Sequence, residues 1–505
     1  MPSLNLGGDR VNDHDLTVHK MVKLIADKKI NAVELIQETL KRIERLDPII
    51  NSYITVSKTE ALKKASKIQK KLDEDTKCHI LAGIPMAVED SICTRGVRTT
   101  AGSKMLEKFI PPYDATVMKK LSLKGTPLLG KLNMDEFGVG GYDKDCHFKN
   151  TKNPWQSAER SKSPCKGTAA SVASGMAGFA LGADMDGSLR QSAADCGVVG
   201  LKPTYGLVSR FGLISTAPSF EQIGVVTCDV TDCALVLNAI SGYDTLDSTS
   251  ANMEHPDYTS FLQGDIKGLK IGIAREYIEG EAISHSAKKA ILNAIETLTA
   301  LGAKCEEFSF SMAQYSAIAH YIIATSEIGS SLARYDGVKY GYRALDCLDI
   351  SQLYFKTRME GFGLGVKERI ILGTYILSEK HHDVYYKKSL KVRTLIQKKF
   401  DDIFKKYDLI LGLTVPNILS KKDGMKSRFS KIPYQNMHTV SANLAGLPAI
   451  SLPCGFDNNK SPVGLHFIGR HFDEGTLLRT GFAFEQNTDF HKKRPKLEWV
   501  DKNAL

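Results

Sequence analysis

The sequence predicts an α/β protein with a large mixed β-sheet that is covered by helices on both faces. Three observations support this fold class. The chain has 505 residues, of which 42% are hydrophobic, so it can bury a large core. Short apolar runs of strand length alternate with longer helix-forming stretches along the chain. A region of helical periodicity also precedes the first apolar run, and it predicts a helical layer at the N-terminus.

Residues 15–75 make up this predicted helical layer. Asn31 and Glu34 have the spacing of a capping box, in which each side chain bonds the backbone N–H of the other residue. The apolar stripe that follows stops at Pro48, where a helix is expected to end. The layer is expected to pack against the core as part of the same fold.

The strands of the predicted sheet are short, buried and spread over the rest of the chain. Residues 280–405 are mostly helix-forming, and residues 286–304 have amphipathic spacing. The basic stretch 420–431 is expected to be an exposed loop. The predicted organisation is a helical layer at 1–75, a main domain at 76–490 and a tail at 491–505. The predicted strands are IPMAV (84–88), TPLLG (126–130), CGVVGL (196–201), LKIGIA (269–274), LILGL (409–413) and PAISL (448–452).

Composition limits the possible classes of protein. The net charge of +10, from 67 basic and 57 acidic residues, is mild for this length and permits contact with RNA or an acidic partner without requiring it. Ten cysteines without a C-x-x-C pair indicate reduced thiols instead of a disulfide framework or a zinc site. No run approaches the roughly 18 apolar residues of a membrane span. A cytoplasmic protein without membrane contact is expected, and an organellar location stays open.

The most informative segment is GTAASVASGMAGFALGADMDGSLR, residues 167–190. Gly, Ala or Ser occupies 14 of its 24 positions, and the run ends with Gly187 beside Ser188. Small residues let backbones approach closely and place a hydroxyl on a tight turn. Acyl transfer needs such a nucleophile next to backbone N–H donors. The segment therefore predicts the position of a catalytic serine.

This segment and CGVVGLKPTYG (196–206) resemble the signature of the amidase signature family. LAGIPMAVED (81–90), KLNMDEFGVG (131–140) and KNPW (152–155) also match the family. SANLAGLPAISLPCGF (441–456) and PVGLHFIGRHFDEGTLLR (462–479) are similar to one branch, the A subunits of glutamyl-tRNA(Gln) amidotransferases. The resemblance implies the amidase-signature fold and an activity that releases ammonia from glutamine.

In that family a lysine deprotonates a first serine, which relays the proton from the nucleophilic serine. The resemblance places the nucleophile at Ser188, the relay serine at Pro164 and the lysine at Glu89. Proline has neither a hydroxyl nor an N–H, and an ionised glutamate is only an acceptor. Losing catalytic groups that act together typically costs about 10⁴- to 10⁶-fold in turnover. Hydrolysis by the family mechanism is therefore expected to be impaired.

The oxyanion loop and the substrate clamp are altered as well. The loop is Met185-Asp186-Gly187, where the family has Gly-Gly before the serine. A carboxylate that points inward would oppose the oxyanion, and the loss of one oxyanion donor costs about 2.7–4 kcal/mol. The glutamine clamp of the branch corresponds to Arg369 and Asn436. Asparagine cannot pair ionically with the substrate's ammonium group, so half of the clamp is changed.

Several other features have simpler interpretations. Cys165 could replace the relay if Lys166 lowered the pKa of its thiol, but a small core thiol is the default interpretation. The segment 125–131 fits most of a phosphate loop but has Leu132 in place of Ser or Thr, which favours an ordinary strand and turn. Neighbouring histidines 381 and 382 point in different directions on a helix and cannot share a metal.

Three functional hypotheses remain. The first is an amidotransferase A-type chain with a broken relay, for which the resemblance implies B- and C-type partner subunits, indirect contact with tRNA, and glutamine or another amide as ligand. No cofactor is expected in this chain, because ATP and Mg²⁺ would belong to a partner. The second is a non-catalytic scaffold or regulator. The third is an enzyme with revised chemistry that uses Ser188 or Cys165 with Glu89 or Asp186.

Overall fold

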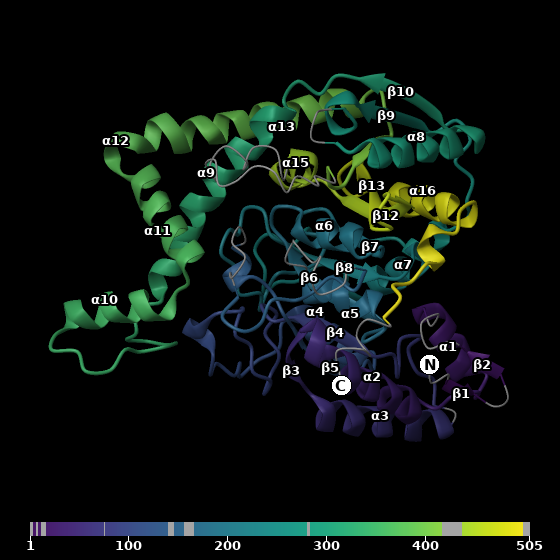
Figure 1. Ribbon diagram of the computed structural model, residues 1–505, viewed down its shortest axis with the longest axis horizontal. Coiled ribbons are helices and arrows are strands. Elements are labelled where there is room, and N and C mark those ends of the chain that lie inside the picture. The colour runs from purple at the N-terminus through teal and green to yellow at the C-terminus, as the bar shows by residue number, and fades with distance from the viewer. Residues whose placement is uncertain are drawn as a thin grey trace.

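A computed structural model describes residues 4–6, 9–11, 17–74, 76–139, 146–155, 166–279, 283–416 and 437–497. Its centre is a mixed sheet in the order β10-β9-β11-β13-β12-β7-β8-β6-β4-β5-β3 (Figure 1). A separate hairpin pairs β1 with β2. The strands are β1 Leu4–Leu6, β2 Asp9–Val11, β3 Tyr53–Val56, β4 Met86–Glu89, β5 Leu128–Leu132, β6 Phe179–Asp184, β7 Val199–Lys202, β8 Gln222–Thr227, β9 Lys270–Ala274, β10 Lys304–Phe308, β11 Leu409–Leu413, β12 Ala449–Phe456 and β13 Pro462–Gly469.

Helices cover both faces of this sheet, as predicted. The alternation of side chains along β4 makes this clear, because Met86 and Val88 belong to one hydrophobic core and Ala87 to another. The helices are α1 Val18–Ala26, α2 Ala32–Ile50, α3 Lys58–Asp73, α4 Thr116–Leu123, α5 Gly167–Ala173, α6 Ser188–Asp195, α7 Val230–Ile240, α8 His285–Ala300, α9 Ala313–Ser331, α10 Ile350–Gly361, α11 Leu364–Leu377, α12 Glu379–His381, α13 Lys388–Phe404, α15 Met437–Ala445 and α16 Glu474–Gln486.

All six predicted strands are present, as β4, β5, β7, β9, β11 and β12. They pair in both directions: β4 runs parallel to β5 and β6, whereas β12 runs antiparallel to β7 and β13. The prediction missed β3, β6, β8, β10 and β13. The small residues of β6 hide a strand within the signature segment, and charged residues dominate the edge strand β10.

The N-terminal helices α2 and α3 pack against each other at one end of the molecule, and α1 contacts α7 (Figure 1). Asn31 accepts from Glu34 N and Glu34 accepts from Asn31 N, which confirms the capping box. The expected end at Pro48 is wrong, because α2 continues to Ile50. Pro48 lies in the last turn, where few hydrogen bonds remain to be lost, and Asn51 ends the helix with a φ of 58°.

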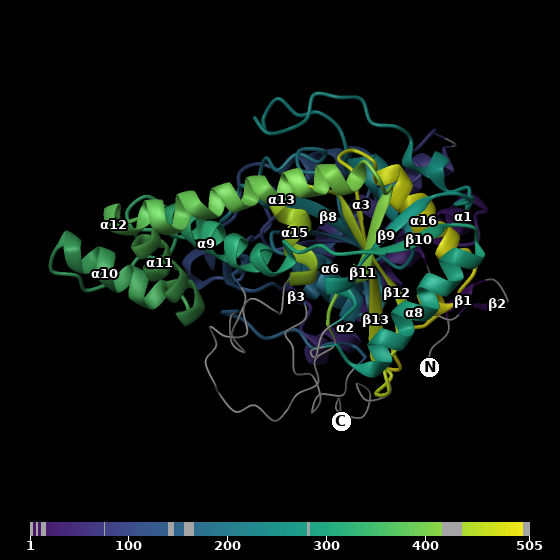
Figure 2. The same ribbon diagram turned by 90° about the horizontal axis from the view of Figure 1, so that it is seen from above.

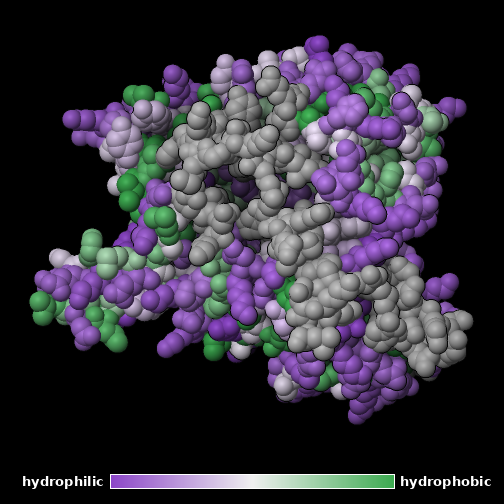
Figure 3. Space-filling model, viewed as in Figure 1, coloured by the Kyte–Doolittle hydropathy of each residue, from purple (hydrophilic) through white to green (hydrophobic). Residues whose placement is uncertain are grey.

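Helices α9 to α13 form an arm that projects from the sheet (Figures 1 and 2). A π-helix over His382–Lys387 joins α12 to α13. Apolar side chains are visible on the surface of this arm, at the left of Figure 3. Leu348 is 89% exposed and Phe355 is 69% exposed. None of the described helices has the length and apolar character needed to cross a membrane.

Candidate active site

A tight turn between β6 and α6 presents Ser188. β6 ends at Asp184 and α6 begins at Ser188, so Met185, Asp186 and Gly187 form the whole connection. Gly187 has a φ of 98°, a conformation that side chains with a Cβ rarely adopt. A Cβ atom at this position would also lie 2.1 Å from Thr439 Oγ1. The turn therefore requires glycine directly before the serine.

A buried ion pair anchors this turn. Arg190 Nε donates to Asp184 Oδ2 at 2.8 Å, and both side chains are fully buried. The guanidinium also donates to Asn443 Oδ1 at 2.5 Å and lies 2.8 Å from His466 Nε2. Burial alone would raise the pKa of Asp184, but the charge and hydrogen bonds of Arg190 hold it well below its ordinary value. This buried network thus fixes the turn that presents Ser188.

Carboxylates accept hydrogen bonds from the backbone N–H groups of the turn. Gly187 N donates to Asp184 Oδ1 at 2.7 Å, and Ser188 N donates to Asp186 Oδ1 at 3.1 Å. An oxyanion hole needs backbone N–H groups that are aimed at the developing negative charge. Here the N–H of Ser188 bonds to the carboxylate that the sequence predicted to interfere.

Ser188 lines a narrow cavity of about 10 Å³ at the end of β4 and β6. Glu89 also lines it, so the structure brings together two of the three predicted catalytic positions. The third, Pro164, lies outside the described residues, as do Cys165, Asn436 and the loop 420–431. The remaining lining residues are Ser91, Met134, Phe137, Gly138, Lys166, Ala183, Met185, Ile214 and Glu221.

The cavity contains an amine that sequence reasoning did not connect with the site. Lys166 Nζ lies 3.3 Å from Glu89 Oε2, and the two side chains are 7% and 0% exposed. Lys166 Nζ also donates to Ala183 O at 3.1 Å, and Ser91 Oγ donates to Glu89 Oε1 at 3.0 Å. The sequence holds a signal for this pair: by the family resemblance, position 89 corresponds to a lysine and position 166 to a glycine, so both members of the pair depart from the expected pattern.

The environment keeps the amine of Lys166 protonated. Burial alone would lower the pKa of Lys166, but nearby carboxylates, Glu89 foremost, raise it above its ordinary value. A protonated amine cannot accept a proton from a serine. Lys166 therefore supplies positive charge to the cavity instead of a base.

Lys131 is a second buried amine close to these strands. It lies on β5, donates to Ile92 O and lies 3.3 Å from Thr94 Oγ1. Burial lowers the pKa of Lys131 to about 8. Lys131 is completely buried, so this position has no resemblance to the exposed lysine of a phosphate loop.

Arg369, the remaining position of the clamp, extends from α11 toward α9. It donates to Thr325 Oγ1 at 2.7 Å, and its guanidinium lies 3.8 Å from the ring centre of Tyr321. On the same helix α9, His320 Nε2 lies 3.0 Å from the carbonyl oxygen of Met185, in the turn that presents Ser188. Burial lowers the pKa of His320.

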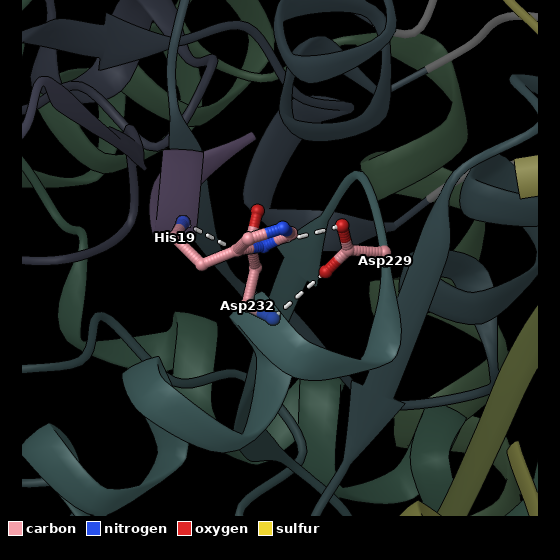
Figure 4. A group of neighbouring side chains, drawn as sticks. All are labelled: His19, Asp229 and Asp232. Carbon is pink, nitrogen blue, oxygen red and sulfur yellow. Dashed lines mark hydrogen bonds and ion pairs between the residues drawn. The ribbon is translucent and has the colours of Figure 1, made fainter. Parts of the chain in front are cut away.

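His19, Asp229 and Asp232 form a separate cluster that has the residue types of a metal site (Figure 4). His19 Nδ1 lies 2.8 Å from Asp232 Oδ1 and 3.6 Å from Asp229 Oδ2. Asp232 also accepts from the backbone N–H groups of Val18 and His19, and Asp229 caps α7. These hydrogen bonds join the start of α1 to the start of α7. This structural role explains why the three side chains lie close together.

The histidines of the arm have packing partners of their own. The ring of His381 stacks on Tyr375 with centroids 3.9 Å apart, and the ring of His382 lies 5.4 Å from that of Tyr386. The two imidazoles thus contact different tyrosines, as expected for neighbours on a helix.

Comparisons with known proteins agree over nearly the whole chain. The model of the family described as Amidase matches residues 34–478. The A subunit of glutamyl-tRNA(Gln) amidotransferase from Carboxydothermus hydrogenoformans is 49% identical over 95% of this chain and 99% of that protein. The protein of the same name from Thermoanaerobacter pseudethanolicus is 47% identical over 95% of this chain and 98% of its own length.

Solved structures show the same relationship. The crystal structure of the A subunit of glutamyl-tRNA(Gln) amidotransferase from Thermotoga maritima has a TM-score of 0.76 and 34% identity, and the match covers 95% of this chain and 96% of that one. A bacterial aryl acylamidase of the amidase signature family shares the fold, with a TM-score of 0.81 and 22% identity over 98% of this chain and 99% of its own.

Proposed function

The chain belongs to the amidase family, and from that premise we propose that it is an A-type component of a tRNA-dependent amidotransferase in which Ser188 no longer hydrolyses glutamine. The single observation that carries the loss of activity is the ion pair between Lys166 and Glu89. It occupies the part of the cavity where the family mechanism needs a neutral amine.

The electrostatics of the cavity support the same conclusion. Glu89 accepts from Lys166 and Ser91, and both bonds stabilise its ionised form, which makes it a weaker base toward the hydroxyl of Ser188. The N–H of Ser188 is bonded to Asp186. This backbone donor is therefore taken up by a carboxylate, and the loss of one oxyanion donor typically costs about 2.7–4 kcal/mol of transition-state stabilisation.

The intact framework supports a role within an assembly. The network of Arg190, Asp184, Asn443 and His466 preserves the turn even though the groups around Ser188 are changed. The relatives are named as the A subunits of glutamyl-tRNA(Gln) amidotransferases. We therefore propose B- and C-type subunits as partners, with ATP, Mg²⁺ and tRNA bound by those subunits, and the cytoplasm as the location.

Reconstitution tests this proposal. The chain is purified with the B and C subunits of its own source or of a close relative, and glutamyl-tRNA amidation is measured with either glutamine or ammonium chloride as nitrogen donor. The proposal predicts assembly, and amidation with ammonium but not with glutamine. Failure to assemble would instead favour an independent pseudoamidase. Amidation from glutamine that is lost in Ser188→Ala but kept in the control Ser66→Ala would contradict the proposal.

Chemical labelling tests the remaining hypothesis of revised chemistry. A fluorophosphonate probe reports a nucleophilic serine, and iodoacetamide reports a reactive thiol such as that of Cys165. The proposal predicts that neither reagent labels these residues faster than it labels the unfolded chain. Selective labelling of Ser188 or Cys165 would favour the revised enzyme.

A further inference from the structure

The exposed surface of α3 carries a cluster of lysines. On a helix, the surface neighbours of a residue lie three and four positions before and after it. All four such neighbours of Lys67 are lysines, namely Lys63, Lys64, Lys70 and Lys71. These five residues, here called the lysine face, span about 12 Å along the helix axis, because a helix rises about 1.5 Å per residue. Like charges at these spacings destabilise a helix, so the fold itself gives no reason for their arrangement.

The chain supplies little negative charge to the lysine face. α3 contains six lysines and two acidic residues, Glu60 and Asp73, and the carboxylate of Asp73 accepts from Gln69 Nε2 at 2.8 Å. Glu74 Oε1 lies 4.0 Å from Lys70 Nζ, at the limit of an ion pair. Among the described residues, no carboxylate forms an ion pair with the remaining exposed lysines of the face, Lys63, Lys67 and Lys71.

Lys64 shows that these charges act on one another. Its Nζ donates to Ser122 O at 2.8 Å, which holds the amine beside the end of α4. Burial lowers the pKa of Lys64, and the positive charges of Lys71 and Lys67 lower it further. The lysine face is therefore a concentrated positive charge that an external polyanion would stabilise.

The apolar residues of α3 are already buried within the fold. Ala61 and Ala65 belong to a hydrophobic core that also includes residues of α2, and Ile68 is 6% exposed. A helix that binds a membrane surface needs exposed apolar side chains to enter the lipid. The core of a protein interface is depleted in lysine and rich in aromatic residues, and α3 contains no aromatic residue. The lysine face thus suits neither a membrane nor an apolar protein surface.

Duplex RNA has the properties that fit this face. A nucleic acid duplex carries a dense row of phosphates, which proteins neutralise with lysine and arginine. Double-stranded RNA is recognised largely through its phosphates and 2′-hydroxyl groups, whereas single strands are bound by stacking their bases on aromatic rings. α3 offers ammonium groups and no ring. The helix lies along the lower edge of the molecule in Figure 1, where hydrophilic residues predominate in Figure 3, so a duplex can reach it from outside the fold.

We propose that the lysine face of α3 binds the phosphate backbone of duplex RNA. The phosphate contact is independent of the proposed function, whereas the choice of RNA over DNA rests on it, because the assembly proposed above acts on tRNA. The partner subunits are proposed to bind tRNA, and the lysine face adds a contact from this chain itself. None of the described residues that line the cavity of Ser188 belongs to α3, so the contact requires no glutamine hydrolysis.

Fluorescence anisotropy of the purified full chain tests this inference. The probe is a labelled RNA duplex of about 16 base pairs, the length that double-stranded RNA-binding domains cover. The competitors are the unlabelled duplex, one of its single strands, a DNA duplex of the same sequence, polyglutamate and vesicles of phosphatidylserine, all at equal total charge. The unlabelled RNA duplex is expected to be the strongest competitor. Stronger competition by any of the others would overturn the inference.

A pair of variants with equal net charge separates the lysine face from the charge of the whole chain. The matched variant removes three charges from the face: Lys63→Gln, Lys67→Gln and Lys71→Gln. Glutamine has a helix propensity close to that of lysine, so α3 is expected to form. The control removes three charges from exposed positions on α8 and α13: Lys288→Gln, Lys391→Gln and Lys398→Gln.

The first variant is expected to bind the RNA duplex about tenfold more weakly than wild type, and the control is expected to stay within about twofold of wild type. Equal losses in the two variants would show that only the net charge matters and would overturn the inference.

The salt dependence of binding shows whether the lysines contact phosphates directly. Each lost phosphate contact makes the plot of log affinity against log salt concentration shallower by about 1, so the slope of the first variant should be shallower by about 3. Its thermal unfolding midpoint should equal or exceed that of wild type, because lysines that repel one another are removed. An unchanged slope would overturn the inference.

The competition series with the wild-type chain decides the matter even if the first variant fails to fold. RNA binding by the isolated chain and amidation by the assembly are separate measurements. Failure to assemble would contradict only the proposed function, whereas an isolated chain that does not bind the RNA duplex would contradict only this inference.

Discussion

Lys166 Nζ and Glu89 Oε2 face each other at 3.3 Å in the cavity that Ser188 lines, and both side chains are buried. The family resemblance implies a lysine at 89 and a glycine at 166, so it predicts no ion pair at these positions. Here the amine lies on residue 166, and its bond to a carboxylate keeps it protonated.

A double-mutant cycle on this pair should show strong coupling. Glu89→Gln and Lys166→Met are each expected to lower the free energy of unfolding by about 3–5 kcal/mol, because each leaves a buried charge without its partner. The double variant is expected to recover most of that loss. Urea unfolding measures all three, and additive losses would show that the pair is not coupled.

Because of the ion pair between Arg190 and Asp184, the free energy of unfolding should decrease as the pH is lowered. The pKa of Asp184 is lower in the folded than in the unfolded state, so its contribution is complete above the unfolded pKa of about 3.9 and is lost as the pH falls below it. Asp184→Asn lacks this group. The stability difference between wild type and Asp184→Asn should therefore shrink by about 1 kcal/mol from pH 5 to pH 3. A constant difference in urea unfolding would mean that Arg190 does not hold this carboxylate.

Gly187→Ala should lower the free energy of unfolding by more than the left-handed backbone conformation of this position would cost by itself. Gly96 provides the control, since it has a φ of 75° and has open space around its Cβ position. Both substitutions should lower stability by about 1 kcal/mol for the left-handed backbone. Gly187→Ala should lose a further 1–3 kcal/mol or so, because its Cβ meets Thr439. Similar losses in the two variants would mean that the turn can move away from Thr439.

Restoring the family residues should require the removal of Lys166 as well. Glu89→Lys with Pro164→Ser alone buries two amines without a carboxylate between them and leaves Asp186 bonded to Ser188 N, so we expect a lower unfolding temperature and no glutamine hydrolysis. Adding Lys166→Gly and Asp186→Gly removes the extra positive charge and the carboxylate bonded to Ser188 N. Measurable ammonia release is expected only from this fourfold variant. Activity in the first double variant would show that Lys166 does not control the site.

The sequence predicted the layers of the fold well, because its apolar runs and its capping box are local signals. It missed β6, whose Gly and Ala residues carry no strand preference by themselves, and β13, where proline, glycine and histidine interrupt the apolar pattern. Their place in the sheet is set by neighbouring strands that are distant in sequence.

For the site, the sequence identified Ser188, Glu89 and Asp186 through the family pattern. It connected Lys166 only with the thiol of Cys165, because a loop lysine 77 residues from Glu89 has no local pattern that indicates an ion pair.

The most direct test of the central claim is the release of ammonia from glutamine by the purified protein, compared between wild type and Ser188→Ala. We predict that both release it at the background rate across pH 6 to 9, because Glu89 keeps the amine of Lys166 protonated in the cavity that Ser188 lines. Turnover well above background in the wild type that disappears in Ser188→Ala would contradict the claim that Lys166 and Glu89 have disabled this site.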